Sequence, residues 1–331
     1  MALLHSSMLL TLLLLSIADG LDPDEHCTKH GMECGVENGK VGVEGTKMGE
    51  VGVALVICGE DRLPEALVSL KSAVVLGSAP LELYVFADSE LHAQLRQKLE
   101  NWVEFVSWRR LGFHLYPIQF PDGQEVAWRA LFKTCACQRL FIPNLLAEVD
   151  SVIYVDTDVL FHRPPEALWR LFSRFNSSQI AGLAPEGEDA ATNWYTRFAR
   201  HPFVPPFGVM LMNLTRMREF GWEALLWPLY TQYRFNTTWG DQDLINIIFH
   251  HHPDKLCIFP CHWNFRPDHC MYSPSCGPAS ERGVYMLHGS RGYFHDAQKQ
   301  PAFKAVYDAW LNHELGESLS ELLKASQEKG L

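Results

Sequence analysis

Short apolar runs alternate with amphipathic segments along residues 51–155, and this alternation is the first structural signal in the chain. Apolar runs of roughly four to eight residues that end at Gly or Asp are typical of buried parallel strands, whereas helical spacing of apolar residues predicts helices. The predicted strands are Val51–Cys58, Leu81–Ala87, Phe113–Pro117 and Val152–Val155. The helices predicted between them are Leu63–Leu76, Leu91–Asn101 and Trp128–Phe141. This alternation indicates an α/β fold with a doubly wound, mostly parallel central sheet.

The second half of the chain is less regular. Its pattern predicts two helices, Trp222–Tyr233 and Asp241–His250, and strands at Phe207–Asn213, Cys257–Pro260 and Val284–Leu287. It contains no internal repeat and no long linker, so we expect one catalytic domain over residues 51–315, followed by a polar tail over 316–331. Residues 21–50 are rich in Gly, Glu and Lys without a hydrophobic period, which predicts a flexible stem.

A hydrophobic segment opens the chain. Residues 8–18 are mostly Leu, Met, Ile and Thr, a run shorter than the roughly 20 residues of a spanning helix. Residues 1–20 therefore predict a signal peptide or an uncleaved anchor, and either sends the rest of the chain into the secretory lumen. Three Asn-x-Ser/Thr sequons, at Asn176, Asn213 and Asn236, agree with this location.

The nine cysteines predict disulfides with at least one thiol left over. The group Cys257, Cys261-His262, His269-Cys270 and Cys276 resembles a zinc site faintly, but disulfides are the favoured interpretation in an oxidising lumen. Cys27 and Cys34 are close enough in sequence to close a small loop. Cys135 and Cys137 lie in the predicted helix and are interpreted as core residues.

Composition limits the class of partner. The hydrophobic fraction of 47% and the ten Trp residues support a sizeable core. The formal net charge of −11 argues against nucleic acid or an anionic membrane surface as the main partner. An anionic substrate must therefore be met by local cations or by a metal ion.

Two aspartates follow the apolar run Val152–Val155. Because strand side chains alternate between faces, Asp156 and Asp158 are expected on one side, at the carboxyl end of the strand. Paired carboxylates repel each other unless a cation lies between them, and a divalent metal with phosphate as co-ligand satisfies both. His288 follows another apolar run and is a candidate third ligand. A surface turn with solvated carboxylates is the simpler alternative, which the flanking apolar residues disfavour.

Further polar groups follow these segments. Gly289 and Gly292 permit a tight loop whose N–H groups can bind phosphate, with Arg291 and Lys299 as nearby cations. Their alternative role is that of a solvated loop. In Gly240-Asp241-Gln242-Asp243, Asp243 suits a helix cap, while Asp241 and Gln242 can hydrogen-bond a polyol.

Six strings carry a family resemblance. They are QRLFIPNLLAEVDSVIYVDTDVLF, WYTRFARHPF, GVMLMNLTRMR, TTWGDQDLINIIF, FPCHWNFRPDHCMY and LHGSRGYFHDAQKQPAFKAVYDA. In this order the chain resembles the glucoside xylosyltransferases of glycosyltransferase family 8, over most of residues 51–310. The resemblance implies a single GT-A type, Rossmann-like domain in the endoplasmic reticulum or Golgi lumen, on a single-pass type II membrane protein.

The resemblance also implies an activity. It implies Mn²⁺ held by Asp156, Asp158 and His288 at the diphosphate of UDP-xylose. It implies retaining transfer of xylose, in α-1,3 linkage, to O-linked β-glucose on EGF-like repeats of Notch-type glycoproteins. The metal then stabilises the UDP leaving group as a Lewis acid.

Residue roles follow from the same resemblance. The residues implied to receive uridine and ribose are Val56, Cys58, Gly59 and Asp88. Arg139 is implied to reach the phosphate or sugar of the donor, and Lys299 to grip the diphosphate. Gln242 is implied to lie near the anomeric carbon, with Asp241 on hydroxyls of the donor sugar.

One segment departs from the family pattern. Members carry a longer Gly-rich stretch with Asn-Ser-Gly, where this chain has residues 201–208 with two adjacent prolines. The missing polar groups would line a sugar pocket, and proline removes backbone donors. A non-catalytic luminal homologue that binds UDP-sugar or EGF repeats is therefore an alternative. A phosphohydrolase with Asp156 as nucleophile is a weaker one, because the motif lies late in the chain and lacks a downstream acidic pair.

Overall fold

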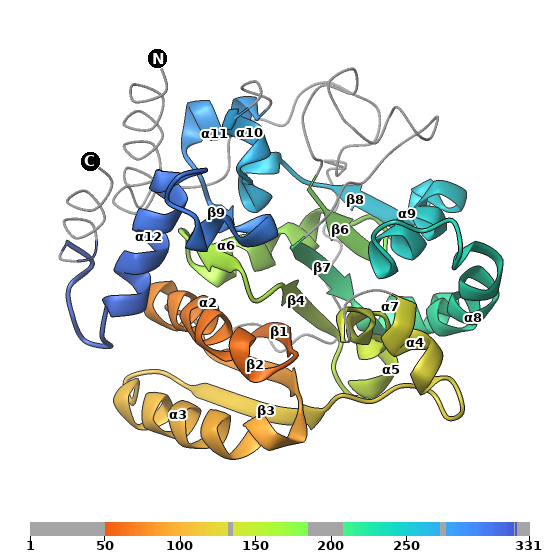
Figure 1. Cartoon of the computed structure of the whole chain (residues 1–331), viewed down its shortest axis with the longest axis horizontal. Helices are drawn as coiled ribbons and strands as arrows, with labels where there is room; N and C mark the ends of the chain where they lie inside the picture. The colour runs from red at the N-terminus through yellow and green to blue at the C-terminus, as the bar shows by residue number, and fades with distance from the viewer. Residues whose placement is uncertain (1–49, 132–134, 185–207, 272–275, 321, 323–331) are drawn as a thin grey trace.

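A sheet of seven strands forms the centre of the molecule (Figure 1). The computed structural model describes residues 50–131, 135–184, 208–271, 276–320 and 322. The strand order is β3 (Leu111–Pro117), β2 (Leu81–Ala87), β1 (Val51–Ile57), β4 (Ser151–Val155), β7 (Val209–Asn213), β6 (Ala181–Leu183) and β8 (Leu256–Ile258). Within this sheet β7 runs antiparallel to both of its neighbours, and the other pairs are parallel. The predicted α/β fold with a mostly parallel sheet is confirmed.

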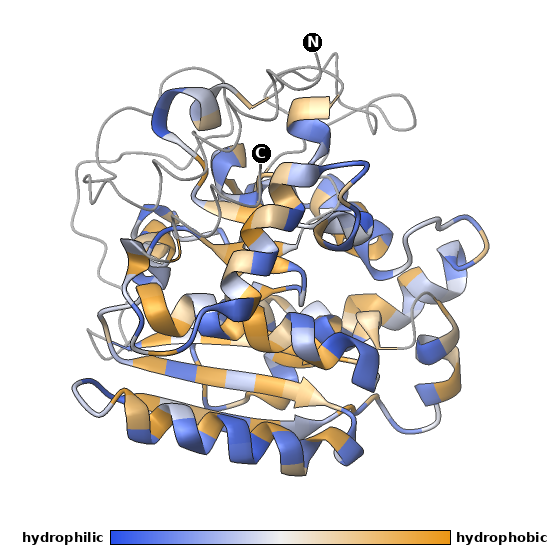
Figure 2. Ribbon diagram, turned by 60° about the vertical axis from the view of Figure 1, so that its left-hand side comes forward, coloured by the Kyte–Doolittle hydropathy of each residue, from blue (hydrophilic) through white to orange (hydrophobic). Residues whose placement is uncertain are grey.

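Helices cover both faces of this sheet. Alternate residues of β1 enter different cores: Val53 and Leu55 pack with α2 (Leu63–Leu76), α3 (His92–Phe105) and α6 (Pro165–Trp169). Ala54 and Val56 pack in the second core, whose helices are α5 (Ile142–Leu145), α7 (Leu214–Phe220), α8 (Trp222–Tyr233) and α9 (Asp241–His251). Figure 2 shows the outer helix α3 with hydrophilic and hydrophobic residues interleaved, as expected for a helix with one face on a sheet.

A two-stranded sheet lies outside the main one. It pairs β5 (Val159–Phe161) with β9 (Met286–His288) in antiparallel register. Beside it are α10 (Asp268–Met271), α11 (Gly277–Arg282) and α12 (Pro301–Asn312). A third core joins these elements to α2, and Leu322, in the segment predicted as a polar tail, is buried in it.

Most predicted elements are confirmed. Strand Leu81–Ala87 and the helices Leu63–Leu76 and Trp222–Tyr233 have the predicted ends. The three-residue strands β5 and β6 lie outside the predicted elements, because runs this short carry little periodicity. The predicted segments 1–20 and 21–50, with Cys27 and Cys34, lie outside the described residues except for residue 50.

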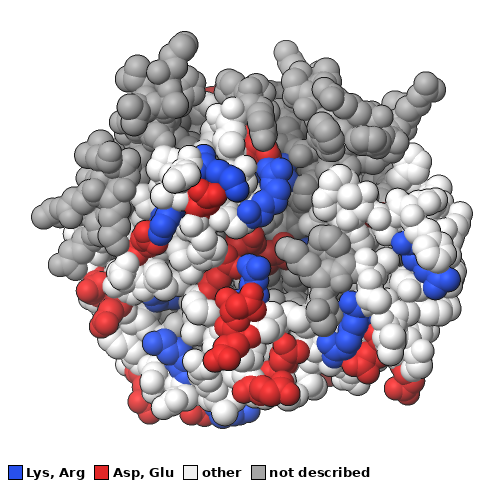
Figure 3. All heavy atoms as spheres, viewed as in Figure 1, with Lys and Arg blue, Asp and Glu red and all other residues white. Residues whose placement is uncertain are grey.

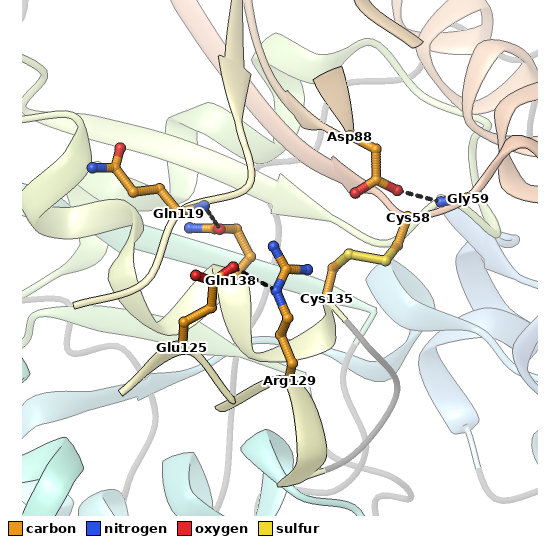
Figure 4. The surroundings of a disulfide bond; sticks show 8 residues. All are labelled: Cys58, Gly59, Asp88, Gln119, Glu125, Arg129, Cys135 and Gln138. Carbon is orange, nitrogen blue, oxygen red and sulfur yellow. Dashed lines mark hydrogen bonds and ion pairs between the residues drawn. A yellow bond between two sulfur atoms is a disulfide. The ribbon is translucent and has the colours of Figure 1, made fainter. Parts of the chain in front are cut away.

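The continuous helix predicted at Trp128–Phe141 is wrong. The described residues there form α4 (Glu125–Leu131) and a separate 3₁₀ helix, η3 (Ala136–Phe141). Cys135, just before η3, is bonded to Cys58 at the end of β1 (Figure 4). The helical spacing of apolar residues therefore arises from two shorter elements on one core, and the disulfide fixes η3 against the end of β1.

Disulfides also explain the second cysteine group. Cys261 pairs with Cys276, and Cys257 is disulfide-bonded as well, so the interpretation as disulfides is confirmed for these three residues. Among the described cysteines, Cys137 and Cys270 are free thiols.

The three predicted sequons differ in exposure. Asn213 is buried in β7, and its side chain caps the next helix by accepting the Arg216 N–H, so this sequon is closed in the folded chain. Asn176 and Asn236 are exposed.

Within the described part of the chain, no helix combines the length and the apolar character needed to cross a bilayer.

His262 is a titratable group inside the fold. It lies in η7 (Cys261–Asn264), is buried, and stacks on Tyr285 with ring centroids 4.1 Å apart. Burial, with a smaller contribution from the nearby Arg282 charge, lowers its pKa to about 3. The folded chain therefore keeps this imidazole neutral where an unfolded chain would protonate it.

We expect acid to destabilise the fold through His262. Because the pKa is depressed in the folded state, the contribution is complete above the unfolded pKa and is lost as the pH falls below it. Between pH 7 and pH 5 this site alone should remove about 2 kcal/mol of unfolding free energy. His262→Gln, which cannot titrate, should lose that much less over the same range in denaturant titrations. The control His251→Gln changes an exposed histidine and should keep the full loss; equal losses in His262→Gln and the unchanged chain would contradict the assignment.

Candidate active site

Polar residues gather where parallel strands end at one edge of the central sheet. Gly59, Asp88 and Asp156 follow β1, β2 and β4, which are neighbours in the sheet. Asp88 Oδ2 accepts the Gly59 N–H at 2.8 Å (Figure 4). Gly59 has φ of 83°, a conformation that favours glycine. This edge is where open α/β sheets bind ligands.

Asp156, Asp158 and His288 come together as predicted. One ligand atom from each lies within 4.8 Å of the others, and His288 Nε2 is 3.3 Å from Asp158 Oδ1. The two-stranded sheet explains the meeting, because His288 pairs with Val159, the residue after Asp158. The Gly289 N–H also donates to the Asp158 carbonyl at 2.7 Å.

Strand alternation, the predicted reason for the meeting of Asp156 and Asp158, is wrong. Strand β4 ends at Val155, and Asp156-Thr157-Asp158 forms a turn into β5, which belongs to the other sheet. Strand alternation therefore does not bring the two carboxylates together. The turn and the pairing of β5 with β9 do so.

Two contacts hold the His288 ring. Its Nδ1 lies 2.9 Å from Asn264 Oδ1, and a proton donated there leaves the lone pair of Nε2 directed toward Asp158. Gly208 packs against the same ring, and a Cβ at Gly208 would lie 2.6 Å from His288 Cε1. The Gly208 carbonyl also accepts the Asp156 N–H at 2.8 Å, so this glycine contacts both sides of the site.

Asp156 is oriented by two buried neighbours. Its Oδ1 accepts the Tyr154 hydroxyl at 2.8 Å and Arg139 Nη1 at 3.2 Å. Arg139 also bonds through Nε to Asp241 Oδ2, and its guanidinium lies 5.4 Å from the Tyr154 ring centroid. One buried cation thus joins η3, β4 and α9.

This cation remains charged. Burial alone would lower the pKa of Arg139, but the carboxylates of Asp241 and Asp156 outweigh burial and raise it. Burial raises the pKa of Asp241 above its ordinary value, and Arg139 opposes that rise. Breaking one partner of such a pair leaves an uncompensated buried charge, which is costly.

Asp241 and Gln242, the residues predicted to bind sugar, lie in the first turn of α9. Asp241 Oδ1 is buried and has no hydrogen-bond partner among the described residues, although Oδ2 is bonded to Arg139. The neighbouring Gln242 is partly exposed. Asp243 accepts the N–H groups of Thr238 and Trp239, both at 2.7 Å, which confirms it as a capping residue. An unsatisfied buried oxygen fits a ligand hydroxyl.

The predicted phosphate loop is only partly available. The Gly289 N–H donates to the Asp158 carbonyl in this structure, so phosphate binding through this group stays a prediction. Gly292 has φ of 79°, as its predicted turn requires. Arg291 bonds to Asp268, and the exposed Lys299 pairs with Asp296 at 3.1 Å.

The predicted nucleotide segment also changes. Val56 lies near the end of β1 and Cys58 follows its last residue, Ile57, but the Cys58 sulfur is bonded to Cys135. Any contact of Cys58 with a nucleotide must therefore use its backbone. Asp88 lies near both sulfur atoms, yet a disulfide offers no thiolate, so these three residues do not form a metal site.

The donor set of the other cluster fits a hard divalent cation. Two carboxylates and one imidazole offer oxygen and nitrogen ligands, and Asp156 and Asp158 would repel each other without a positive charge. Acidic side chains gather near the centre of the face shown in Figure 3. The site therefore attracts a cation more readily than a bare diphosphate.

Three residues at the site lie outside the sequence prediction. Tyr154 could have been found, because it is a residue with a hydroxyl in the apolar run that Asp156 follows directly. Asn264 and Gly208 are distant from the residues that they support and carry no local signal.

Comparison with known proteins identifies the sequence family. The profile described as Glycosyl transferase family 8 matches residues 55–276. Mouse glucoside xylosyltransferase 1 is 49% identical over 288 residues, covering 82% of this chain and 70% of its own. The human protein of that name is 49% identical, and the match covers 78% of this chain and 61% of the human protein. Glucoside xylosyltransferase 2 of Xenopus laevis is 49% identical, and the match covers 81% of this chain and 66% of that protein. The chain thus spans between 61% and 70% of the length of these relatives.

Solved structures share the fold. The galactosyltransferase LgtC, in complex with donor and acceptor sugar analogs, matches with a TM-score of 0.61 at 16% identity, covering 82% of this chain and 100% of its own. Apo mouse xyloside xylosyltransferase 1 matches with a TM-score of 0.52 at 18% identity, covering 73% and 98%.

We expect Gly208→Ala to weaken metal binding. The added Cβ would displace the His288 ring from Asp158, and displaced support of a ligand costs roughly 10- to 100-fold in metal affinity. Titration of Mn²⁺, followed by calorimetry, measures the change. Gly277→Ala is the matched control, because a Cβ there meets no atom within 4 Å. An unchanged Mn²⁺ affinity in Gly208→Ala would show that the ring does not depend on this glycine.

Proposed function

This chain belongs to glycosyl transferase family 8 and is a glycosyltransferase, and we propose that it transfers xylose from UDP-xylose to glucose on a glycoprotein. The names of the glucoside xylosyltransferases, 49% identical to it, support this donor and acceptor. We further propose retaining α-1,3 transfer to O-linked β-glucose on EGF-like repeats of Notch-type proteins. The phosphohydrolase alternative does not agree with the family.

The meeting of Asp156, Asp158 and His288 is the observation that carries the proposal. These residues would hold Mn²⁺, which supplies positive charge to the diphosphate as UDP departs. Asn264 and Gly208 keep His288 in place, and the chain positions the ligands through the turn and the two-stranded sheet.

The protein side chains are proposed to orient the donor. Asp88 uses Oδ2 on the Gly59 N–H, and its other oxygen makes no hydrogen bond within the described chain, so it can accept a ribose hydroxyl. Asp241 Oδ1 is likewise available for a hydroxyl of the sugar. Gln242, next in α9, would lie at the reacting face of xylose, where its amide can both donate and accept.

Arg139 is proposed to have a second role beside the donor contact that the family resemblance implies. Its guanidinium uses Nε on Asp241 and Nη1 on Asp156, so we propose that it neutralises and aligns these two carboxylates. Asp241 would then contact the donor as well. Xylose lacks the exocyclic CH₂OH of glucose, so selection of UDP-xylose would depend on bulk that closes this part of the pocket.

A location in the lumen of the endoplasmic reticulum or Golgi is part of the proposal. The disulfides Cys58–Cys135 and Cys261–Cys276 support it, because such bonds persist in oxidising compartments. The hydrophobic segment at residues 1–20 is proposed as the type II anchor or signal peptide.

The test is transfer to a defined acceptor. We expect the chain, incubated with UDP-xylose, Mn²⁺ and an O-glucosylated EGF repeat, to add one pentose, measured by mass spectrometry. Omission of Mn²⁺ should abolish the gain. UDP binding without any transfer would instead favour the non-catalytic homologue, with the short 201–208 segment as the first part to restore.

The metal ligands are tested separately. Asp158→Asn should reduce transfer by at least 100-fold, because it removes a charged ligand while keeping the shape of the side chain. Thermal unfolding should change little, since Asp158 is partly exposed. Asp254→Asn, an exposed carboxylate paired with Lys255, is the control and should retain full transfer. Full activity of Asp158→Asn would rule out the metal role of this residue.

A further inference from the structure

Glu65 is a buried carboxylate that the proposed reaction does not use. It lies in the first turn of α2, with 3% of its surface exposed. A buried carboxylate is stable only when it is paired and hydrogen-bonded. Glu65 has three partners: Arg62 Nη1 at 3.3 Å, the Thr157 hydroxyl at 3.1 Å and His295 Nε2 at 2.9 Å.

Two of these partners, Thr157 and His295, belong to the segments that carry the predicted metal ligands. Thr157 stands between Asp156 and Asp158 in the turn after β4. His295 ends η8 (Ser290–His295), the loop that follows His288. Glu65 therefore touches no predicted metal ligand, yet it joins the two segments that carry all three of them.

The loop after β9 requires such support. Arg291 has φ of 60°, which is the left-handed region and is unfavourable for a residue with a Cβ. Strained backbone persists only where surrounding contacts hold it. At its start the loop is held by the Gly289 N–H on the Asp158 carbonyl, and at its end by Phe294 in the third core and by His295 on Glu65.

A carboxylate suits this position better than an amide. Three donor groups converge on the two oxygens of Glu65, and an ionised carboxylate accepts from all of them without presenting a donor. A glutamine of the same shape has one oxygen and an NH₂ group. At least one of the three contacts must then be lost or reversed.

We propose that Glu65 is a positioning residue that sets the distance between the Asp156-Thr157-Asp158 turn and the loop after His288. It thereby shapes the site for the metal and the diphosphate together. The proposal rests on the proposed function, because it assigns a role in the same donor site. It adds a residue that acts through Thr157 and His295 rather than by touching a ligand.

The experiment compares four single variants and one double variant of the whole chain by Mn²⁺-dependent UDP binding in a calorimeter. Glu65→Gln should weaken UDP binding about tenfold, the size typical for supports of metal ligands. Thr157→Val and His295→Gln should each weaken it by less. Adding Thr157→Val to Glu65→Gln should cost less than the sum of the two single losses, because both changes act on one connected set of hydrogen bonds.

A structural control separates positioning from general destabilisation. Ser72, on the same helix, is buried and accepts the Phe161 N–H of β5 at 3.0 Å. Ser72→Ala should lower the unfolding temperature and leave UDP binding unchanged. In Glu65→Gln, hydrogen–deuterium exchange of residues 289–295 should become faster while exchange in β1 stays the same.

Failure of the role proposed for Glu65 can be distinguished from failure of the proposed function. If the unchanged chain binds no UDP with Mn²⁺, the proposed function is overturned, and this inference with it. If the unchanged chain binds and Glu65→Gln binds equally well, only the role of Glu65 is overturned. Weakening of equal size in Ser72→Ala, or additive losses in the double variant, would also overturn that role.

Discussion

Repulsion among carboxylates at one edge of the sheet is the constraint on which the site depends. Asp156, Asp158 and Asp241 all lie within this small region, and a chain with a net charge of −11 offers little general compensation. Arg139 provides local compensation by bonding to both Asp156 and Asp241. Asp158 faces His288 instead, which leaves a set of groups that a divalent cation can complete.

The small β5–β9 sheet turns this electrostatic requirement into geometry. It pairs the strand after Asp158 with the strand that ends in His288, although the two are far apart in sequence. The Gly289 N–H, which the sequence suggested for phosphate, is used to fix this pairing. This bond and the β5–β9 register together hold Asp158 beside His288.

Buried polar contacts connect the separate segments of the site. The Cys58–Cys135 disulfide fixes η3, and with it Arg139, against the end of β1. Glu65 connects α2 to the turn and to the loop after β9. Each contact joins an element of the central sheet, or of the helices that cover it, to a turn, loop or 3₁₀ helix of the site. The rigid elements can therefore hold these residues in accurate positions.

The sequence by itself determined the alternation of strands and helices, the class of fold and the chemistry of Asp156 and Asp158. Periodicity and strand-end polarity are local properties, so neighbouring residues suffice to encode them. The tertiary structure alone decided that Cys58 meets Cys135, 77 residues later, and that Arg139 meets Asp241, 102 residues later. It also brought Glu65 to His295 across 230 residues. Such contacts depend on how whole elements pack, and no local pattern records which distant partner a buried charge or sulfur will find.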